Sequence, residues 1–143
     1  MSEYTDFPRD FIDRSKANVE NYNGEYEITN LINNCLGLVI IPKQKLAKNI
    51  PEYEFDDNDK SYGITRSNII HSDDGYSLSQ VVRHIRNGLA HGRIEQRLNC
   101  DKISGLRIHD KFKDSSPENF SIEFTVEEFK CFAFSLSSKL IEQ

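Results

Sequence analysis

The sequence predicts an all-α fold, a four-helix up-and-down bundle with a small β-hairpin inserted before the last helix. Four segments carry apolar residues three and four positions apart, which is the spacing of one face of an amphipathic helix. Two of these segments begin with a capping box, a sequence signal for the start of a helix. A chain of 143 residues, 37% of them hydrophobic, can form one domain with a core, so we place a single domain over residues 1–143.

The first two helices are predicted in the N-terminal part of the chain. The first begins near Asp6, with Pro8 in its opening turn, and ends at the stretch NYNG of residues 21–24. The second covers residues 25–41 and ends before Pro42, because the residue before a proline avoids helical geometry. Apolar residues surround most of its second half, so we expect this helix to be the most buried.

Residues 51–76 interrupt the helical pattern. Their stretch PEYEFDDNDK holds five carboxylates and one lysine and has no regular apolar spacing. Such a run of like charges is typical of solvated chain, so we interpret residues 51–76 as an acidic loop or a partly ordered insertion. A catalytic cluster of carboxylates is the less favoured interpretation.

The third helix is predicted to begin after Ser77, whose side chain can cap the backbone N–H of Gln80 while the Gln80 side chain reaches back. Gly92 is the flexible residue expected just past its end. The apolar stripe of this helix consists of Leu78, Val81, Val82, Ile85 and Leu89.

Residues 103–125 are predicted to form the β-hairpin, with strands over 105–112 and 119–125 joined by a polar turn that contains a proline. The last helix begins at Thr125, which forms a capping box with Glu128. Its buried side is predicted to consist of Phe129, Phe132, Ala133, Leu136 and Leu140.

Composition argues against several classes of protein. The net charge of −5 and the pI of about 5.4 argue against coating of nucleic acid by the whole surface, because such binding depends on neutralising phosphates. The three cysteines fit neither a zinc site nor a disulfide scaffold, and we expect no metal and no cofactor. The sequence shows no leader pattern and no apolar run that could cross a bilayer, so we expect a cytoplasmic protein without a membrane partner.

Cationic and proton-transferring residues gather in the stretch RHIRNGLAHG, residues 83–92. Between residues 77 and 99, four arginines accompany one carboxylate, Glu95, so this segment has a charge of +3 in a chain of net charge −5. A guanidinium binds phosphate through two hydrogen bonds, and an imidazole transfers protons near neutral pH. Together these groups suit RNA cleavage by attack of a 2′-hydroxyl on its own phosphate, a reaction that does not strictly need a metal.

Arg86 and His91 are the candidate catalytic pair, but they do not lie on one side of an ideal helix. A separation of five residues corresponds to about 140° around the helix axis. The length of arginine, a loosening of the helix at Gly88 and Gly92, or a second copy of the helix across a two-fold axis would each bring the two groups together. We favour the second copy and predict a composite site in a homodimer.

The motif RNGLAH of residues 86–91 resembles the signature of HEPN domains, an arginine followed by a polar residue and, further on, a histidine. The opening FPRDFIDRSKANVE and the segment LINNCLGLVIIPKQK are similar to those of a plasmid- and prophage-associated HEPN group. The resemblance implies a small helical bundle. Many HEPN domains are metal-independent RNases of defence, toxin–antitoxin or abortive-infection systems, and their active site forms between two copies.

The resemblance also implies roles for individual residues. It assigns Arg86 to the scissile phosphate, His91 to proton transfer as general acid or base, and Asn87 to positioning one of them. It implies RNA as the substrate, a second copy as a partner, and a cognate antitoxin. HEPN toxins silenced by an adenylylating partner carry a tyrosine two residues after the histidine, where this chain has an arginine, so that form of regulation is unsupported. Neighbouring residues that are candidates for binding phosphate are Arg83, His84 and Arg93.

Two alternatives remain open. The first is a non-catalytic HEPN module that binds RNA or nucleotides, or that forms dimers. In the second, His91 only stabilises the dipole at the helix end, and Arg86 pairs with a loop carboxylate such as Asp56 or Asp57. The two histidines outside the motif region, His71 and His109, are predicted to lie in a loop and a strand and to face solvent.

Overall fold

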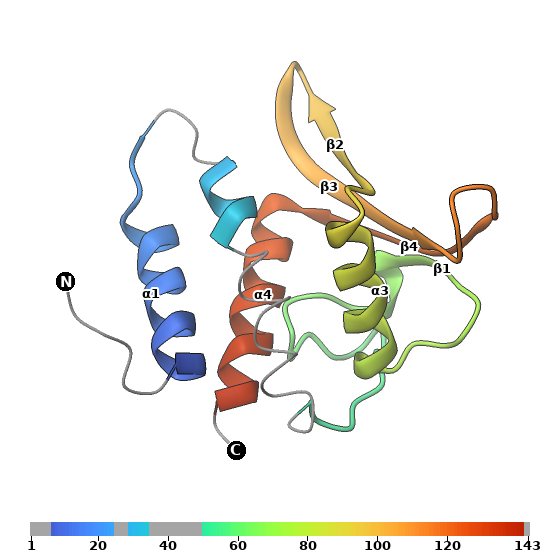
Figure 1. Cartoon of the computed structure of the whole chain (residues 1–143), viewed down its shortest axis with the longest axis horizontal. Coiled ribbons are helices and arrows are strands. Elements are labelled where there is room, and N and C mark those ends of the chain that lie inside the picture. The colour runs from blue at the N-terminus through green and yellow to red at the C-terminus, as the bar shows by residue number, and fades with distance from the viewer. Residues whose placement is uncertain (1–6, 25–28, 35–49, 142–143) are drawn as a thin grey trace.

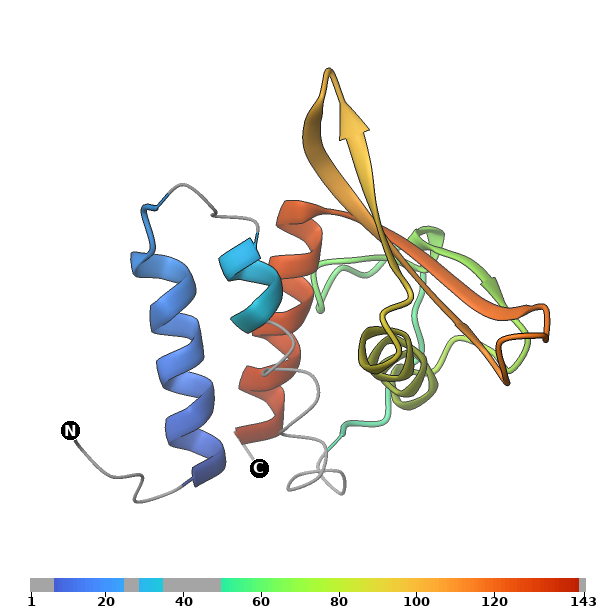
Figure 2. The same cartoon turned by 45° about the horizontal axis from the view of Figure 1, so that its top comes forward.

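The structure is a computed structural model that describes residues 7–24, 29–34 and 50–141. Figures 1 and 2 show α1 beside α4, and α3 against the sheet. Residues 29–34 are also helical. The elements in chain order are α1 (Phe7–Asn21), the 3-10 turn η2 (Arg66–Asn68), β1 (Ile69–Ser72), α3 (Leu78–Ala90), β2 (Ile94–Asn99), β3 (Lys102–Lys111), β4 (Glu118–Thr125) and α4 (Val126–Ile141).

The four strands form one antiparallel sheet in the order β1-β4-β3-β2, so the prediction of an all-α four-helix bundle is wrong. The predicted hairpin exists as β3 and β4, but it is the centre of a larger sheet that β1 and β2 complete. The turn from β2 into β3 contains no glycine, so the usual sequence signal of a tight hairpin was missing. Cys100 and Asp101 adopt φ angles of 53° and 66° in this turn. Asn and Gly are the residues usually found with positive φ in a two-residue hairpin turn.

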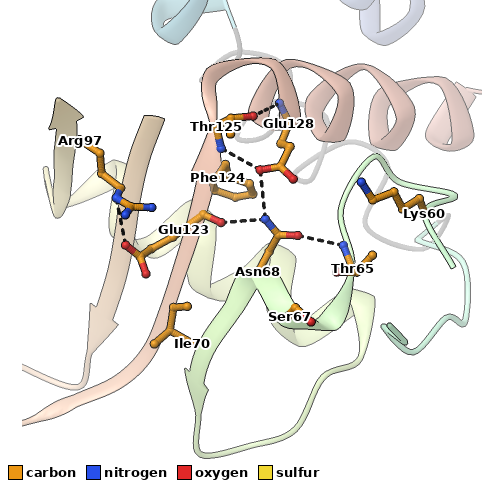
Figure 3. Close-up of a pocket in the computed structure, with 10 residues that line it drawn as sticks. All are labelled: Lys60, Thr65, Ser67, Asn68, Ile70, Arg97, Glu123, Phe124, Thr125 and Glu128. Carbon is orange, nitrogen blue, oxygen red and sulfur yellow. Dashed lines mark hydrogen bonds and ion pairs between the residues drawn. The ribbon is translucent and has the colours of Figure 1, made fainter. Parts of the chain in front are cut away.

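Residues 51–65 are irregular chain whose carboxylates are mostly exposed, as their charge predicts. As a whole, however, residues 51–76 are a structured part of the domain. They contain η2 and β1, and the Asn68 side chain connects them to the rest of the fold. Its oxygen accepts a hydrogen bond from the Thr65 N–H at 3.0 Å, and its amide donates to the Glu123 carbonyl at 2.9 Å (Figure 3). Four apolar side chains of this segment are buried in the core, namely Phe55, Tyr62, Ile64 and Ile69.

The predicted first, third and fourth helices are confirmed as α1, α3 and α4. The predicted helix over residues 25–41 is helical at residues 29–34, and the rest of it lies outside the described residues. All the apolar residues predicted to face inward on α3 and α4 are buried.

The predicted caps set the starts of the two long C-terminal helices. Ser77 accepts a hydrogen bond from the Gln80 N–H at 3.3 Å, while the Gln80 side chain accepts one from Arg83 at 2.9 Å instead of reaching back. At the start of α4, the Glu128 N–H donates to the Thr125 hydroxyl at 3.0 Å, and the Thr125 N–H donates to the Glu128 carboxylate at 2.8 Å (Figure 3). The second helix start is therefore a complete capping box.

The core lies between the helices and one face of the sheet. Ile69, Ile122, Ile108 and Ile94 are in register across all four strands, and the first three are buried. On the same face, the ring of Phe124 packs against those of Phe129 and Phe132 in α4. Each buried aromatic or aliphatic side chain of this kind contributes about 1.5–3 kcal/mol to folding.

The opposite face of the sheet carries charged side chains. Arg107 lies between Glu95 at 2.7 Å and Glu118, and Arg97 pairs with Glu123 at 3.2 Å (Figure 3). This face is therefore polar, which is the pattern of an antiparallel sheet with one side packed and one side solvated. Within the described ranges, no helix has the length and hydrophobicity needed to span a membrane.

Candidate functional site

The last turn of α3 carries the residues of the predicted site, and its end is fixed by two backbone hydrogen bonds. The Gly92 N–H donates to the Leu89 carbonyl at 3.2 Å, and the Arg93 N–H donates to the Gly88 carbonyl at 2.7 Å. This Schellman arrangement needs a residue with positive φ, and Gly92 adopts a φ of 70°. The helix consequently stops at His91, and the chain turns directly into β2.

Gly88 lies inside the motif at the point where α3 contacts β3. A Cβ atom at this position would lie 2.5 Å from the His109 carbonyl oxygen and 2.7 Å from the Ile108 side chain. Glycine therefore allows the helix and the strand to approach closely. It does not loosen the helix, which continues through Ala90.

His84 is buried, and it holds two carboxylates together. Its Nδ1 lies 2.8 Å from Asp110 Oδ2, and its Nε2 lies 2.9 Å from Asp74 Oδ1. Ionised carboxylates only accept hydrogen bonds, so both contacts are satisfied when the ring carries a proton on each nitrogen. The ring also stacks on Phe120, with centroids 4.6 Å apart and an angle of 10° between the planes. With an exposed fraction of 2%, His84 is not available to an RNA phosphate in this structure.

The carboxylate of Asp110, on β3, is the centre of this cluster. It accepts from His84, from the Asn87 amide at 3.4 Å and from Arg93 Nη1 at 3.2 Å, and only 4% of the residue is exposed. Three side chains that the sequence placed at the site are thus fixed by one buried group. The carboxylate connects α3, the start of β2 and the end of β3.

The carboxylate of Asp74 is held in its charged form. Burial alone would raise the pKa of Asp74, but the hydrogen bond from His84, the charge of His84 and the charge of Arg83 together lower the pKa below its usual value. Arg83 contributes through its Nη2, which lies 2.6 Å from Asp74 Oδ2.

Most of the arginines that make this segment basic are paired with carboxylates. Arg83 pairs with Asp74, and Arg97 pairs with Glu123. Arg93 is only 12% exposed and donates to Asp110, to the Lys111 carbonyl and to Asp114 at 3.0 Å. Their charges are therefore largely neutralised within the chain, and the charge of +3 counted from the sequence does not appear as a continuous basic surface.

Arg86 differs from these arginines. It is half-buried, and no carboxylate in the described part of the chain pairs with it. Burial lowers the pKa of Arg86, and the positive charge of Arg83 acts in the same direction. The alternative pairing with Asp56 or Asp57 does not occur, since those carboxylates accept hydrogen bonds from Asn58 and Ser67. Arg86 is thus a partly desolvated cation with no carboxylate partner among the described residues.

His91 lies at the C-cap of α3 and is exposed. It lines a groove of about 390 Å³ together with other polar residues. Phe112, at the rim, is 87% exposed. The negative charge beside the groove is stable, because the hydrogen bond and charge of Arg93 lower the pKa of Asp114, with smaller contributions from Lys111 and His91. The groove is lined by Asn87, His91, Arg93, Asp110, Lys111, Phe112, Lys113 and Asp114.

The structure thus brings three of the predicted site residues together in one groove, Asn87, His91 and Arg93. Arg86 is not among the residues that line it, in agreement with the five-residue spacing. A groove with an imidazole, two lysines and an exposed aromatic ring has the chemistry to bind a phosphate and to stack on a base.

The two organising carboxylates, Asp74 and Asp110, escaped sequence analysis. A signal for Asp110 was present, because it continues the inward alternation of Leu106 and Ile108 on a strand. A carboxylate at a buried strand position needs a cationic partner, and the nearest candidates lay on α3. Asp74 had no comparable signal, because it lies in a turn among other acidic residues.

His71 and His109 take up different environments. His71 is exposed and pairs with Asp73 at 2.9 Å, whereas the His109 side chain is 14% exposed and lies 3.6 Å from Glu118. Among the residues described, no group of three or more His, Cys, Asp or Glu side chains has the arrangement of a metal site.

A family model described as HEPN pEK499 p136 matches residues 1–143. No curated protein and no solved structure matches the chain.

Proposed function

Since the chain belongs to the HEPN family, we propose that it is a metal-independent endoribonuclease of a defence, toxin–antitoxin or abortive-infection system. The observation that carries this proposal is the state of Arg86. Partial burial of a cation without an anion is costly, and the described carboxylates pair with Arg83, Arg93 and Arg97 but not with Arg86. An RNA phosphate is the anion that this guanidinium would bind.

The proposed reaction is cleavage by the RNA's own 2′-hydroxyl. A base takes the 2′-hydroxyl proton, the 2′-oxygen bonds to phosphorus, and the bond from phosphorus to the 5′-oxygen breaks as an acid protonates that oxygen. The products are a 2′,3′-cyclic phosphate and a 5′-hydroxyl. His91 serves as one of the two proton-transfer groups, Arg86 stabilises the charge on the phosphoryl oxygens, and Asn87 orients the phosphate.

The groove beside His91 supports binding of a single RNA strand. Lys111 and Lys113 are cations that suit backbone phosphates, and the exposed ring of Phe112 offers a surface for stacking a base. Asp110 keeps the Asn87 amide in place, because it accepts its hydrogen bond while being held by His84.

We propose further that the site is completed in a homodimer. Arg86 does not line the groove that contains His91, so one copy alone does not present both groups to the same phosphate. A two-fold interface would place groups of a second copy at the groove.

The test is cleavage of single-stranded RNA by the purified chain in the presence of EDTA. We expect products with 2′,3′-cyclic phosphate ends, and a loss of roughly 100-fold or more in rate for His91→Ala and for Arg86→Ala. Matched controls are His71→Ala and Arg66→Ala, an exposed histidine on β1 and an arginine that stacks on Tyr76. These variants should cleave at the parent rate. An inert parent, or site variants as active as the controls, would refute the proposal.

A second candidate function is a non-catalytic module that binds RNA or nucleotides or forms dimers. It is favoured by the ion pairs that neutralise Arg83, Arg93 and Arg97. In that case RNA would bind without being cleaved, and expression would not be toxic to the host cell. A toxin that acts by cleavage should instead arrest growth unless its antitoxin is present, and His91→Ala should remove the toxicity.

A further inference from the structure

The two edge strands of the sheet, β1 and β2, differ in how readily their free backbone groups could pair with a strand of another chain. The edge strand β1 has four residues and an irregular register with β4, features that discourage pairing with another chain. The other edge, β2, has six residues, of which five are exposed, and its hairpin with β3 projects away from the helices (Figures 1 and 2). No strand in the described part of the chain pairs with its outer side.

The ladder between β2 and β3 determines which backbone groups of β2 point outward. The His109 N–H donates to the Arg93 carbonyl at 3.1 Å, so residues 93 and 109 are a hydrogen-bonded pair. The pairs of Glu95 with Arg107 and of Arg97 with Gly105 follow at alternate positions in the same register. The backbone groups of Ile94, Gln96 and Leu98 therefore point away from the sheet.

We propose that this edge is an interface for a second copy of the chain, paired antiparallel to its own β2 about a two-fold axis at Gln96. Across the two-fold axis, the free backbone groups of one β2 can bond only to the free backbone groups of the other. The axis must therefore pass through a residue position, such as 95, 96 or 97, and not between two residues. The register centred on Gln96 places Glu95 opposite the partner's Arg97, and Ile94 opposite the partner's Leu98.

The neighbouring registers are disfavoured by charge. A centre at residue 95 places Glu95 opposite the partner's Glu95, and a centre at residue 97 places Arg97 opposite the partner's Arg97. These positions are non-hydrogen-bonded pairs, in which opposed side chains lie closest, so like charges there are destabilising. The sequence of β2 is thus self-complementary in one register.

Pairing in this register also covers exposed apolar surface and extends the existing ion pairs. Leu98 is 56% exposed, and the partner's Ile94 would lie beside it on the helix-packed face of the sheet. On the other face, Glu95 pairs with Arg107 and Arg97 with Glu123 within each copy. In the dimer these pairs join into one alternating run of charges across the two-fold axis.

The pairing gives the second copy a position relative to the groove. The partner's turn at Cys100 and Asp101 continues past Ile94 and lies alongside Arg93, at the end of α3. In this pairing the two copies of α3 lie at opposite ends of the joined strands, so the partner approaches the groove of His91 with its hairpin turn and not with its own Arg86. The interface is therefore separate from the contact that would complete the proposed nuclease site, and it does not rest on the proposed function.

The first test measures self-association of the full chain by sedimentation velocity over a range of concentrations. Glu95→Arg and Arg97→Glu should each weaken the dimer by roughly tenfold or more, because each creates two like-charged pairs across the interface. A mixture of the two variants should form a heterodimer, because every Arg then faces a Glu. Glu20→Arg, an exposed position on α1, is the matched control and should associate like the parent. Thermal unfolding of each variant checks that it is folded.

The second test follows amide hydrogen exchange at low and high protein concentration. The N–H groups of residues 94, 96 and 98 should become protected as the dimer forms, whereas those of Glu95 and Arg97 should be protected throughout. A chain that stays monomeric at its highest concentration, a dimer indifferent to the charge reversals, or protection without this alternation would overturn the interface. A dimer that does not cleave RNA would leave the interface standing and refute only the proposed function.

Discussion

The cations of the α3 segment fall into two groups that the sequence does not distinguish. Arg83, His84 and Arg93 are bound to carboxylates, whereas Arg86 and His91 form no ion pair within residues 7–24, 29–34 and 50–141. Both groups consist of arginine and histidine, and both lie within residues 83–93. What separates them is the arrival of Asp74, Asp110 and Asp114 from other parts of the chain. Cations of a basic motif can bind an anionic ligand only where the fold does not pair them with a carboxylate.

The largest expected effect comes from removing the central carboxylate. Asp110→Ala leaves the buried His84 ring and the Arg93 guanidinium without their shared partner, and we expect it to lower the free energy of unfolding by about 3–5 kcal/mol. Arg86→Ala, in the other group, should change it by less than about 0.5 kcal/mol, because Arg86 pairs with none of the described carboxylates. Urea denaturation of both variants measures the contrast. Equal losses of stability would mean that the two groups do not differ as described.

A smaller effect is expected from Asp74→Asn. The carboxylate of Asp74 is partly exposed, so losing its charged hydrogen bonds to His84 and Arg83 should cost about 1–2 kcal/mol near pH 7. Because folding lowers the pKa of Asp74 below its usual 3.8, its contribution is complete above that pH and is lost as the pH falls through the folded pKa.

The stability difference between the parent and Asp74→Asn should therefore shrink as the pH falls below 3.8. The neighbouring Asp73→Asn is the control, since the Asp73 side chain is exposed and pairs with the exposed His71, so this variant should show little difference at any pH. A difference for Asp74→Asn that persists unchanged into acid would show that its charge is not the source of the stabilisation.

The smallest effect is expected from Asp114→Asn, which removes one of the two carboxylates that pair with Arg93. Asp114 is fully exposed, so the thermal midpoint should not change measurably. Removing its charge from the rim of the groove should instead strengthen binding of a single-stranded RNA by about two- to threefold at low salt. Fluorescence anisotropy with His91→Ala as the background measures binding without cleavage. Unchanged affinity at low salt would place the RNA elsewhere.

Local signals in the sequence predict a large part of this fold. Capping residues and apolar spacing locate α3 and α4 correctly, and strong alternation locates β3 and β4. The two edge strands were missed because β1 is short and lies in an acidic stretch, while β2 is exposed on nearly every residue. Strands of this kind form through their partners in the sheet, and pairing between distant segments leaves little trace in local composition.

In the candidate site too, local features were predicted from the sequence and contacts between distant segments were not. The groove residues Asn87, His91 and Arg93 come from one stretch of sequence and were proposed together. The roles of His84 and Arg93 in binding Asp110 depend on a contact between α3 and β3, which a pattern along the chain does not contain. A single sequence therefore identifies a basic motif more readily than it identifies which of its charges are structural.

The close contact at Gly88 has a consequence for how this motif tolerates change. Alanine is the best helix former, and at most interior helix positions it would stabilise the chain relative to glycine. Here one added methyl group would meet the β3 backbone and lift the end of the helix from the sheet. Gly88, which has no side chain, therefore fixes the distance between the end of α3 and the sheet, and with it the positions of Asn87 and His91.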